Sequence, residues 1–325
     1  MSFARKKPKS MKIVSNIDFK KSSIILIILS VFLSCNSDKK ENDLTRENLK
    51  GKVKTLIETS YEAYDRFGKI EKGNRKRKYD FLYDFQKIYN KKGNIIEEKE
   101  YNLDGSLNWK RFYKYNERGH RIEMNKFNSD GHLLRSYVVE FDDDQNKEAT
   151  TYNDAEGVTD SKWVNKFDDK GNEIETNKYN SKGNIVSKWI YKFDDKGNKI
   201  QENKYNSDGN LSSKYVYKHD DKGNMIEENE YKSDGSFDSN YSYKYDDNGN
   251  EIETIFNLSS GYFKVVKKYD DKDNQIEKNF YNENDILTSN YTYEYEFDKQ
   301  GNWIKKIEFD NNIPTYIWER EFEYY

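Results

Sequence analysis

The chain has 325 residues, of which 34 % are hydrophobic, 16 % aromatic and 35 % charged, with two prolines and one cysteine. Such polarity is typical of disorder, but the 28 tyrosines and 18 phenylalanines recur at alternate positions of short segments, which predicts an ordered sheet with an aromatic core. One cysteine excludes an internal disulfide, and the acidic net charge of −3 excludes nucleic acid as the expected partner.

Residues 1–34 are predicted to be a signal peptide. Two lysines precede an apolar run of about thirteen residues, which is too short to span a bilayer and typical of a signal-peptide core. The run ends in VFLSC, which resembles a bacterial lipoprotein signal with Cys35 as the lipidated residue, although Phe32 stands where that motif usually has Leu. An incidental cysteine in an uncleaved anchor is the alternative. Met11 is an alternative start, and removal of residues 1–34 leaves a net charge of −9.

Residues 35–48 are polar and lack periodicity, which predicts a tether between the lipid and the folded domain. Asp38 and the Lys-Lys-Glu that follows it resemble the export tag of surface lipoproteins of the Bacteroidetes. A solvated linker has the same composition, so the side of the outer membrane stays open.

Residues 49–88 are predicted to be a degenerate repeat that caps the array, because terminal repeats are usually atypical. Alternating residues predict strands at 53–61 and 79–85. The basic cluster at 75–78 is expected to be a solvated loop or an edge-strand charge that blocks sheet pairing, with an anionic surface as the alternative ligand.

Residues 89–325 are predicted to form a β-repeat array. An aromatic residue, replaced once by histidine, opens each copy at intervals of 26 residues, and a strict period of this length indicates a stacked array. The openers are Tyr89, Tyr115, Phe141, Phe167, Phe193, His219 and Tyr245. Tyr269 and Phe297 follow at spacings of 24 and 28, which predicts a local bulge or a shortened strand near 259–263.

Each copy contains two turn signals, for example DDKG from Asp194 and NSDG from Asn206. Asp or Asn at the first position and Gly at the fourth predict type I turns whose Gly takes the left-handed conformation. The segments between the turns are short and rich in Ile, Val, Tyr and Thr, so each copy is predicted as strand, turn, strand, turn. Ile200 and Tyr205 are five residues apart and cannot share a face, which predicts a bulge, or a Tyr at the strand end.

Alternation places Trp189, Tyr191 and Phe193 on one face of a strand and Lys188 and Lys192 on the other. One face is therefore expected to be an aromatic ladder and the other to be charged. A single repeat has too small a core to fold alone, so stability must come from stacking. The predicted fold class is all-β: a long curled antiparallel β-meander of about 18 strands, built from two-strand repeats, with the ladder on the concave or enclosed side.

The phrase Tyr-x-Tyr-Asp-x-x-Gly-Asn-x-Ile resembles the YD repeat of the RHS family. It occurs as YKYNERGHRI from Tyr113, YKFDDKGNKI from Tyr191, YKHDDKGNMI from Tyr217 and YKYDDNGNEI from Tyr243. The resemblance covers about residues 89–310 and implies an antiparallel strip that curls into a shell, in an exported, surface-associated setting. The self-cleaving core motif and effector domain of large family members have no counterpart here. Choline-binding repeats are also similar, but their period is shorter.

No catalytic residues are predicted. His120, His132 and His219 occupy different places in their repeats, and a partly buried ring is the expected role of His219. Asp pairs such as Asp194-Asp195 lack the ligand spacing of a calcium loop, so no metal and no cofactor are expected, and Ca²⁺ is the minor alternative. The aromatic candidates for stacking on a ligand are Trp109, Trp163 and Trp189, and the alternative is that they belong to the core.

The sequence predicts a lipid-anchored binding or scaffolding protein of the cell envelope that is not an enzyme. Its predicted partners are the outer membrane, through the lipid on Cys35, and a glycan or a protein. It would face the periplasm or the cell surface. An envelope enzyme is one alternative, and a partner or immunity protein of an RHS-type toxin system is another.

Overall fold

The fold is described by a computed structural model. The described residues are 42–78, 83–144, 146–259 and 261–325, which belong to one unit spanning residues 36–325. The predicted signal peptide, Cys35 and the residues 79–82 of the second predicted strand lie outside them.

The described residues contain one short helix and 21 strands, in an order that follows the predicted repeats. They are α1 (Asp43–Arg46), β1 (Val53–Arg66), β2 (Lys69–Arg75), β3 (Asp84–Tyr89), β4 (Ile95–Tyr101), β5 (Leu107–Tyr115), β6 (Arg121–Asn128), β7 (Leu133–Phe141), β8 (Lys147–Asn153), β9 (Thr159–Phe167), β10 (Glu173–Asn180), β11 (Ile185–Phe193), β12 (Lys199–Asn206), β13 (Leu211–His219), β14 (Met225–Lys232), β15 (Phe237–Tyr245), β16 (Glu251–Leu258), β17 (Gly261–Tyr269), β18 (Gln275–Tyr281), β19 (Leu287–Phe297), β20 (Trp303–Asp310) and β21 (Ile313–Tyr324). Each strand is short because a turn signal ends it.

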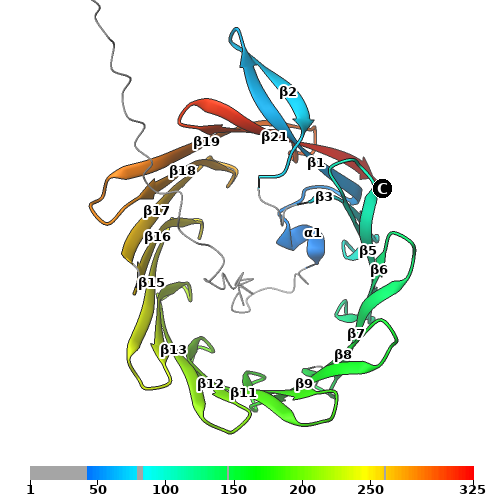
Figure 1. The fold of residues 1–325 in the computed structure, drawn as a ribbon, viewed down its shortest axis with the longest axis vertical. Helices are drawn as coiled ribbons and strands as arrows, with labels where there is room; N and C mark the ends of the chain where they lie inside the picture. The colour runs from blue at the N-terminus through cyan, green and yellow to red at the C-terminus, as the bar shows by residue number, and fades with distance from the viewer. Residues whose placement is uncertain (1–41, 79–82, 145, 260) are drawn as a thin grey trace, which may run out of the picture. The chain divides into compact units, whose positions relative to one another are not determined.

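The strands close into a barrel. From β3 to β21 each strand pairs antiparallel with its sequence neighbours, and β21 then pairs with β1 from Val53 to Glu62. The other edge of β1 pairs with β3 at Thr55–Glu58, which completes the ring (Figure 1). Among the described residues β2 pairs only with β1 and projects from the ring as a hairpin, so 20 strands form the barrel.

The prediction of antiparallel strands in sequential order is confirmed, whereas the predicted curled meander of about 18 strands is in fact a closed barrel of 20 strands. An open sheet leaves two rows of unpaired N–H and C=O groups, and closure through β1 satisfies both rows. The twist that accumulates over many strands brings the two edges toward each other. The strand that joins them comes from residues 49–88, the segment predicted as a cap.

The turns have the predicted geometry. In the DDKGN turn, Gly197 N donates to Asp194 O at 3.1 Å, and Gly197 has a φ of +86°. The Asp194 carboxylate accepts hydrogen bonds from the backbone N–H of Lys196 at 3.0 Å and of Asn198 at 2.8 Å. It also accepts one from the Asn198 side chain at 2.9 Å. These bonds use both carboxylate oxygens, which explains why the repeat pairs Asp with Asn.

The bulge predicted between Ile200 and Tyr205 is confirmed. Lys192 pairs with Gln201, but the next residue, Phe193, pairs with Lys199, so Ile200 has no partner opposite it. The extra residue shifts the alternation and returns later side chains to the correct face.

The structure corrects the prediction of a bulge or a shortened strand near 259–263. β16 pairs with β17 without any register shift, and Leu258 lies opposite Gly261. The two missing residues therefore shorten the connection and remove the bulge, while β17 keeps nine residues. The two residues gained in the next copy lengthen β19 to 11 residues.

The aromatic ladder lies on the inside of the barrel, as predicted. α1 lies within the ring (Figure 1), and its side chains contact Tyr89 and Tyr115 of the ladder. The opposite face carries ion pairs such as Lys218 with Glu227 at 2.7 Å. Equivalent pairs of 2.7 to 2.9 Å are Lys114–Glu123, Lys166–Glu175, Lys244–Glu253 and Lys268–Glu277. The outer face is therefore charged and hydrated.

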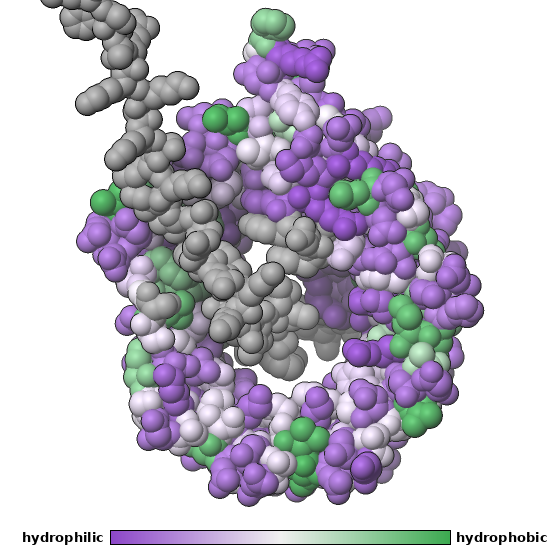
Figure 2. All heavy atoms as spheres, in the orientation of Figure 1, coloured by the Kyte–Doolittle hydropathy of each residue, from purple (hydrophilic) through white to green (hydrophobic). Residues whose placement is uncertain are grey.

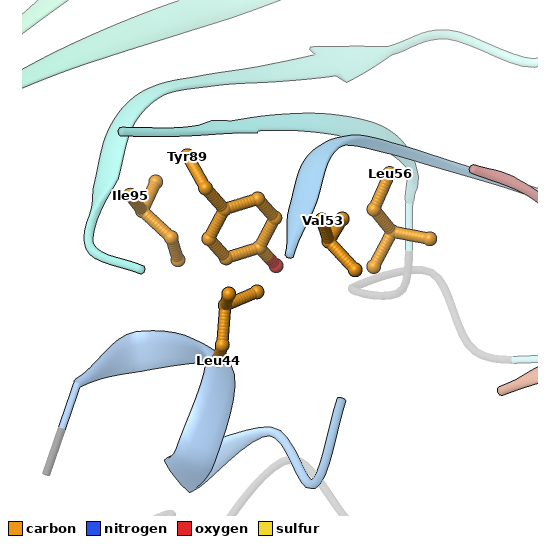
Figure 3. Close-up of a cluster of buried hydrophobic side chains, with 5 residues drawn as sticks. All are labelled: Leu44, Val53, Leu56, Tyr89 and Ile95. Atoms are coloured by element: carbon orange, nitrogen blue, oxygen red, sulfur yellow. The ribbon is translucent and has the colours of Figure 1, made fainter. Parts of the chain in front are cut away.

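Fully buried apolar side chains are few and gather at the seam around β1. One cluster contains Leu44, Val53, Leu56, Tyr89 and Ile95 (Figure 3), and the second contains Ala63, Ile307 and Ile317. The residues that close the ring thus have the best-packed environment in the described part of the chain.

The segment predicted as a tether, residues 35–48, ends inside the fold. Asn42 accepts a hydrogen bond from Thr45 N at 2.9 Å and caps α1, and Leu44 is buried in the first cluster. The polar composition of the segment hides this role, because a four-residue helix with one apolar anchor has no detectable periodicity.

Candidate functional site

The candidate site is the inner wall, by which we mean the side of the barrel strands that carries the aromatic ladder. Charged side chains also lie on this wall. Glu202 lies between Tyr191 and Tyr215 on the neighbouring strands, and Lys204 lies between Trp189 and Ser213. The expectation that charge is confined to the opposite face is wrong for the shorter strands, which place Glu and Lys among the rings, and for the longer strands β5 and β7, whose Arg111 and Arg135 also lie among the rings.

The barrel is wider than its own side chains fill. Barrels of about sixteen or more strands leave a channel or enclose other material, and this one has 20. Figure 2 shows open space inside the ring beside β11 and β12, with hydrophilic side chains over much of the face in view. Many rings of the ladder are only half-buried, as in the case of Trp163 and Trp189. The inner wall is therefore accessible to a guest molecule.

Two of the three predicted stacking residues are brought together. The rings of Trp163 and Trp189 stack with their centroids 5.1 Å apart and their planes 19° from parallel. Lys178 lies 5.2 Å from the Trp163 ring and Lys204 lies 5.4 Å from the Trp189 ring. The pair forms a flat, polarised surface, since each ring has both an aromatic and a cationic neighbour.

Trp109 lies apart from that pair, on β5. Arg111 lies 4.1 Å and Lys126 4.3 Å from the centroid of its ring. Both cations come from the inner wall, so Trp109 belongs to a basic region rather than to an isolated aromatic platform.

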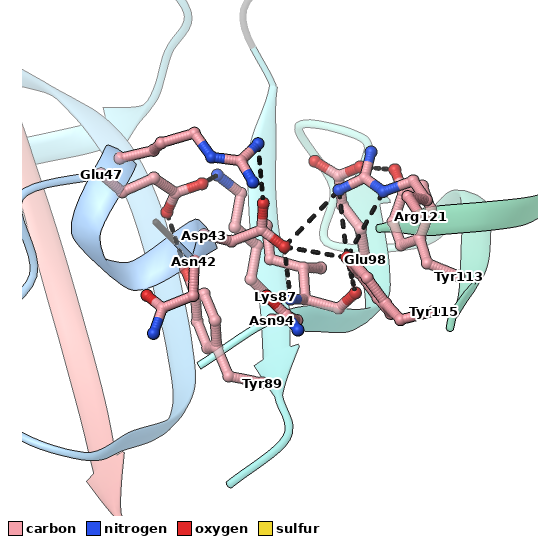
Figure 4. Close-up of polar contacts among 12 residues, drawn as sticks. Asn42, Asp43, Glu47, Lys87, Tyr89, Asn94, Glu98, Tyr113, Tyr115 and Arg121 are labelled. Carbon is pink, nitrogen blue, oxygen red and sulfur yellow. Dashed lines mark hydrogen bonds and ion pairs between the residues drawn. The ribbon is translucent and has the colours of Figure 1, made fainter. Parts of the chain in front are cut away.

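The inner wall holds one peptide of its own chain, α1 (Figure 4). The Asp43 carboxylate accepts hydrogen bonds from Ile95 N at 2.7 Å and the Tyr115 hydroxyl at 2.8 Å, and it lies 3.6 Å from Arg121. One turn later the Glu47 carboxylate binds Lys87 at 2.6 Å and the Tyr89 hydroxyl at 2.7 Å. Burial, followed by the charge of Glu47, raises the pKa of Tyr89. The wall therefore binds carboxylates with tyrosine hydroxyls and cations.

A different arc of the wall is acidic. Glu228 is 4 % exposed between Tyr217 and Tyr241 on the neighbouring strands. Burial, assisted by the charges of Glu230 and Glu202 against that of Lys199, raises the pKa of Glu228 to about 7. A carboxyl in this position carries a proton at mildly acidic pH.

The titration of Glu228 is expected to make the barrel less stable at pH 8 than at pH 5.5. A carboxyl whose pKa is raised by folding contributes fully below its ordinary pKa of 4.5, and the contribution is lost as pH rises through about 7. Between pH 5.5 and pH 8 the difference is about 2 kcal/mol in the free energy of unfolding. Urea unfolding at the two pH values should show that Glu228→Gln is less sensitive to pH and more stable than wild type at pH 8.

Glu227→Gln is the matched control for this experiment. Glu227 is adjacent in sequence but lies on the outer face, where the hydrogen bond from Lys218 lowers its pKa. Its carboxylate contributes stability above pH 4.5, so the control variant should lose stability at both pH values. An identical pH dependence in Glu228→Gln and wild type would contradict the assignment.

A buried charge cluster lies on the inner wall near the seam. Glu308 is 1 % exposed and accepts from Lys78 Nζ at 2.5 Å. On the same strand, Lys306 lies 4.2 Å from the centroid of the Trp318 ring, and burial lowers the pKa of Lys306. Glu308 thus offsets the charge of Lys78, and Glu58 and Glu308 together favour the charged form of Lys306.

The basic cluster at 75–78 is bound by partners within the chain. Lys76 pairs with Glu62 at 2.9 Å, Arg77 donates to the Tyr101 carbonyl at 2.9 Å, and Lys78 binds Glu308. Arg75 lies 3.8 Å from Asp84. These contacts fix residues 75–78 to the barrel, and they favour a structural role for the cluster.

The histidines do not form a common site. His120 stacks on Phe141 with ring centroids 5.1 Å apart. His219 is the last residue of β13, where other copies have the aromatic opener, and burial lowers its pKa. In the part of the chain that the structure describes, no three His, Cys, Asp or Glu side chains are arranged to hold a metal ion. No helix among the described residues has the length and apolarity needed to cross a bilayer.

Comparisons with known proteins show no matching family model and no matching curated protein. Among solved structures, the chain is similar to the TcdB2-TccC3-TEV structure, with 12 % sequence identity and a TM-score of 0.32. The match covers 74 % of this chain and 16 % of the TcdB2-TccC3-TEV chain. The Photorhabdus luminescens Tc holotoxin pore is 13 % identical with a TM-score of 0.30, and the match covers 79 % of this chain and 18 % of the pore chain. A porin-like protein from Bacteroides uniformis is 10 % identical with a TM-score of 0.34, and the match covers 83 % of this chain and 96 % of the porin-like protein.

The chain spans less than a fifth of the length of the two toxin chains that it matches. All three TM-scores lie below 0.5, so nothing about the ligand of this chain follows from them.

Proposed function

We propose that this chain is a lipid-anchored, non-catalytic binding protein of the bacterial outer membrane, and that the inner wall of its barrel holds a glycan. The observation that supports the proposal is a 20-strand barrel whose partly exposed rings and charges face an interior with open space beside β11 and β12. A wall that served only as a core would bury its rings against one another.

The chemistry of the inner wall suits sugar rings. Flat aromatic faces stack on the apolar faces of pyranoses, and Glu and Lys side chains beside them supply acceptors and donors for the hydroxyl groups. The stacked pair of Trp163 and Trp189 combines these features, because Lys178 and Lys204 lie beside it. We therefore place the neutral part of the glycan site at this pair.

A polypeptide guest is the second candidate. α1 shows that a peptide docks on the inner wall through two carboxylates and one leucine. A protein partner that presents a similar acidic and apolar segment would use the same groups.

The glycan proposal is tested with a glycan array probed with the detergent-solubilised full chain. The double variant Trp163→Ala/Trp189→Ala is expected to bind its glycan at least about tenfold more weakly, since it loses two stacking faces worth about 1 kcal/mol each. Phe112→Ala is the control, because Phe112 is an exposed aromatic residue on the outer face. Unchanged glycan binding in a folded double variant would reject the proposal, and capture of one protein from intact cells would favour the second candidate.

The proposed anchor is tested separately by replacing Cys35, the cysteine at the predicted cleavage site. Cys35→Ala should move the protein from the membrane fraction to the soluble fraction, because stable anchoring needs more than one acyl chain. Metabolic labelling with a palmitate analogue should mark wild type only. Membrane retention of an unlabelled Cys35→Ala variant would indicate an uncleaved anchor.

A further inference from the structure

A row of three cations crosses β5, β6 and β7 on the inner wall. Arg111 lies directly opposite Lys126, and Lys126 lies directly opposite Arg135. Like charges at opposed positions of a sheet repel one another. Burial, followed by the charges of Arg111 and Arg135 among its neighbours, lowers the pKa of Lys126. The row therefore costs stability in the empty barrel.

The carboxylates of the wall offset this charge only in part. Arg111 pairs with Glu98 at 3.2 Å, while its Nε is buried without a hydrogen-bond partner. In the described residues neither Lys126 nor Arg135 has an ion-pair partner. Arg135 is exposed, and the Arg111 side chain is one-third exposed, so a ligand reaches both from the barrel interior.

The repeat architecture does not require these cations. Other copies carry an aromatic residue at the position of Arg111 and a serine at the position of Arg135. The aromatic residues are Phe85, Tyr137, Trp163, Trp189, Tyr215 and Tyr241, and the serines are Ser161, Ser187, Ser213 and Ser239. The same strands form in those copies, so Arg111 and Arg135 serve a purpose other than folding.

Trp109 adds a sugar-stacking group to the row. It also replaces the serine of the repeat, and the Arg111 and Lys126 cations lie 4.1 Å and 4.3 Å from its ring centroid. An aromatic face beside several cations suits a ligand that has both a ring and a negative charge.

This part of the wall already binds a carboxylate. On the neighbouring strands, Asp43 of α1 is held by Ile95 N, the Tyr115 hydroxyl and Arg121. The row extends the same chemistry around the barrel to positions that α1 leaves open.

We infer that Trp109, Arg111, Lys126 and Arg135 form a subsite for the carboxylate-bearing sugars of an acidic polysaccharide. The inference rests on the proposed glycan-binding function and adds the charge class of the ligand. Three strands about 4.8 Å apart place the cations along roughly 10 Å, which is long enough to contact successive charged residues of one chain.

The test compares binding of polygalacturonate and of its fully methyl-esterified form to the full chain in detergent. The two polymers share one backbone and differ in charge. Polygalacturonate is expected to bind about tenfold or more tightly than the ester at low salt, and added NaCl should reduce the difference. The variant Arg111→Tyr/Arg135→Ser restores the residues of other copies and should lose this preference. Lys192→Ser, which removes a charge from the outer face, should keep it.

Several results would overturn the inference. Equal binding of acid and ester, an unchanged preference in the double variant, or equally tight binding of poly-L-glutamate would each exclude a subsite for acidic sugars. If neutral glycans still bind through Trp163 and Trp189 in these experiments, the proposed function stands and only the inference fails. Absence of every glycan signal, neutral and acidic, would overturn the proposed function as well.

Discussion

Removal of β21 is expected to abolish the folded barrel. A stop codon after Asn312 deletes the strand that pairs with both β20 and β1, and it removes the buried side chains of Ile317 and Trp318. The truncated sheet would present two unpaired edges, which are templates for aggregation. We expect no cooperative thermal transition by circular dichroism and elution as aggregates in size-exclusion chromatography.

A smaller deletion outside the barrel ring is the control. Replacement of Tyr64–Glu71 by Asn-Gly removes the projecting tip of the β1–β2 hairpin and leaves Ala63 opposite Lys72, joined by a favoured two-residue turn. This variant should elute as wild type and unfold cooperatively. A truncated chain that remains monomeric and unfolds like wild type would show that closure is dispensable.

The substitution Glu308→Ala is expected to destabilise the barrel by about 3 to 5 kcal/mol, which is the usual effect of removing one partner of a buried ion pair. Its carboxylate is almost fully buried, binds Lys78 and accepts from Thr315. Without it, Lys78 loses the Glu308 carboxylate, and the buried Lys306 loses one of the two carboxylates, Glu58 and Glu308, that favour its charged form. The measurement is the midpoint of urea unfolding at pH 7, converted to a free energy with the fitted slope.

The double variant Lys78→Met/Glu308→Met separates a lost ion pair from lost packing. Replacement of both partners by apolar groups of similar volume is often close to neutral, so the double variant should recover about half of the loss or more. Glu319→Ala, which breaks the exposed pair with Lys72, is expected to change stability by less than about 1 kcal/mol. A Glu308→Ala effect as small as that of Glu319→Ala would contradict the role assigned to the buried pair.

Local features were predictable because the residues that cause them are adjacent in sequence. Asp194 and Gly197 contain the whole chemistry of a turn, and the five-residue separation of Ile200 and Tyr205 predicts a bulge or a Tyr at the strand end, of which the structure shows the bulge. The ladder was predictable for the same reason, since side chains alternate along any strand. Stacking of Trp163 on Trp189 needs the cross-strand register as well, and the sequence offered the period of 26 residues as its only signal.

The inward-facing charges of the shorter strands were missed because their face depends on the bulges, whereas Arg111 and Arg135 share the alternation of the rings on their own strands. A bulge beside most of the turns shifts the parity of the shorter strands, so Glu202, Lys126 and Glu228 join the rings instead of opposing them. A signal was present, since these residues keep an alternating spacing within their strands. The face on which these residues lie can be assigned only when the register between strands is known. The docking of Asp43 is a contact with residues 52 to 78 positions away, and no local pattern encodes it.

The sequence by itself determined the strands, their turns, their sequential antiparallel order and the two-sided character of each strand. These features depend on backbone preferences and on residues within one repeat. The tertiary structure alone decided that the ends of the sheet meet, that β1 joins them, and that rings and charges together face an enclosed space. Closure results from small twists summed over 20 strands. The total twist cannot be inferred from the residues of a single repeat, so closure is seen only in the complete barrel.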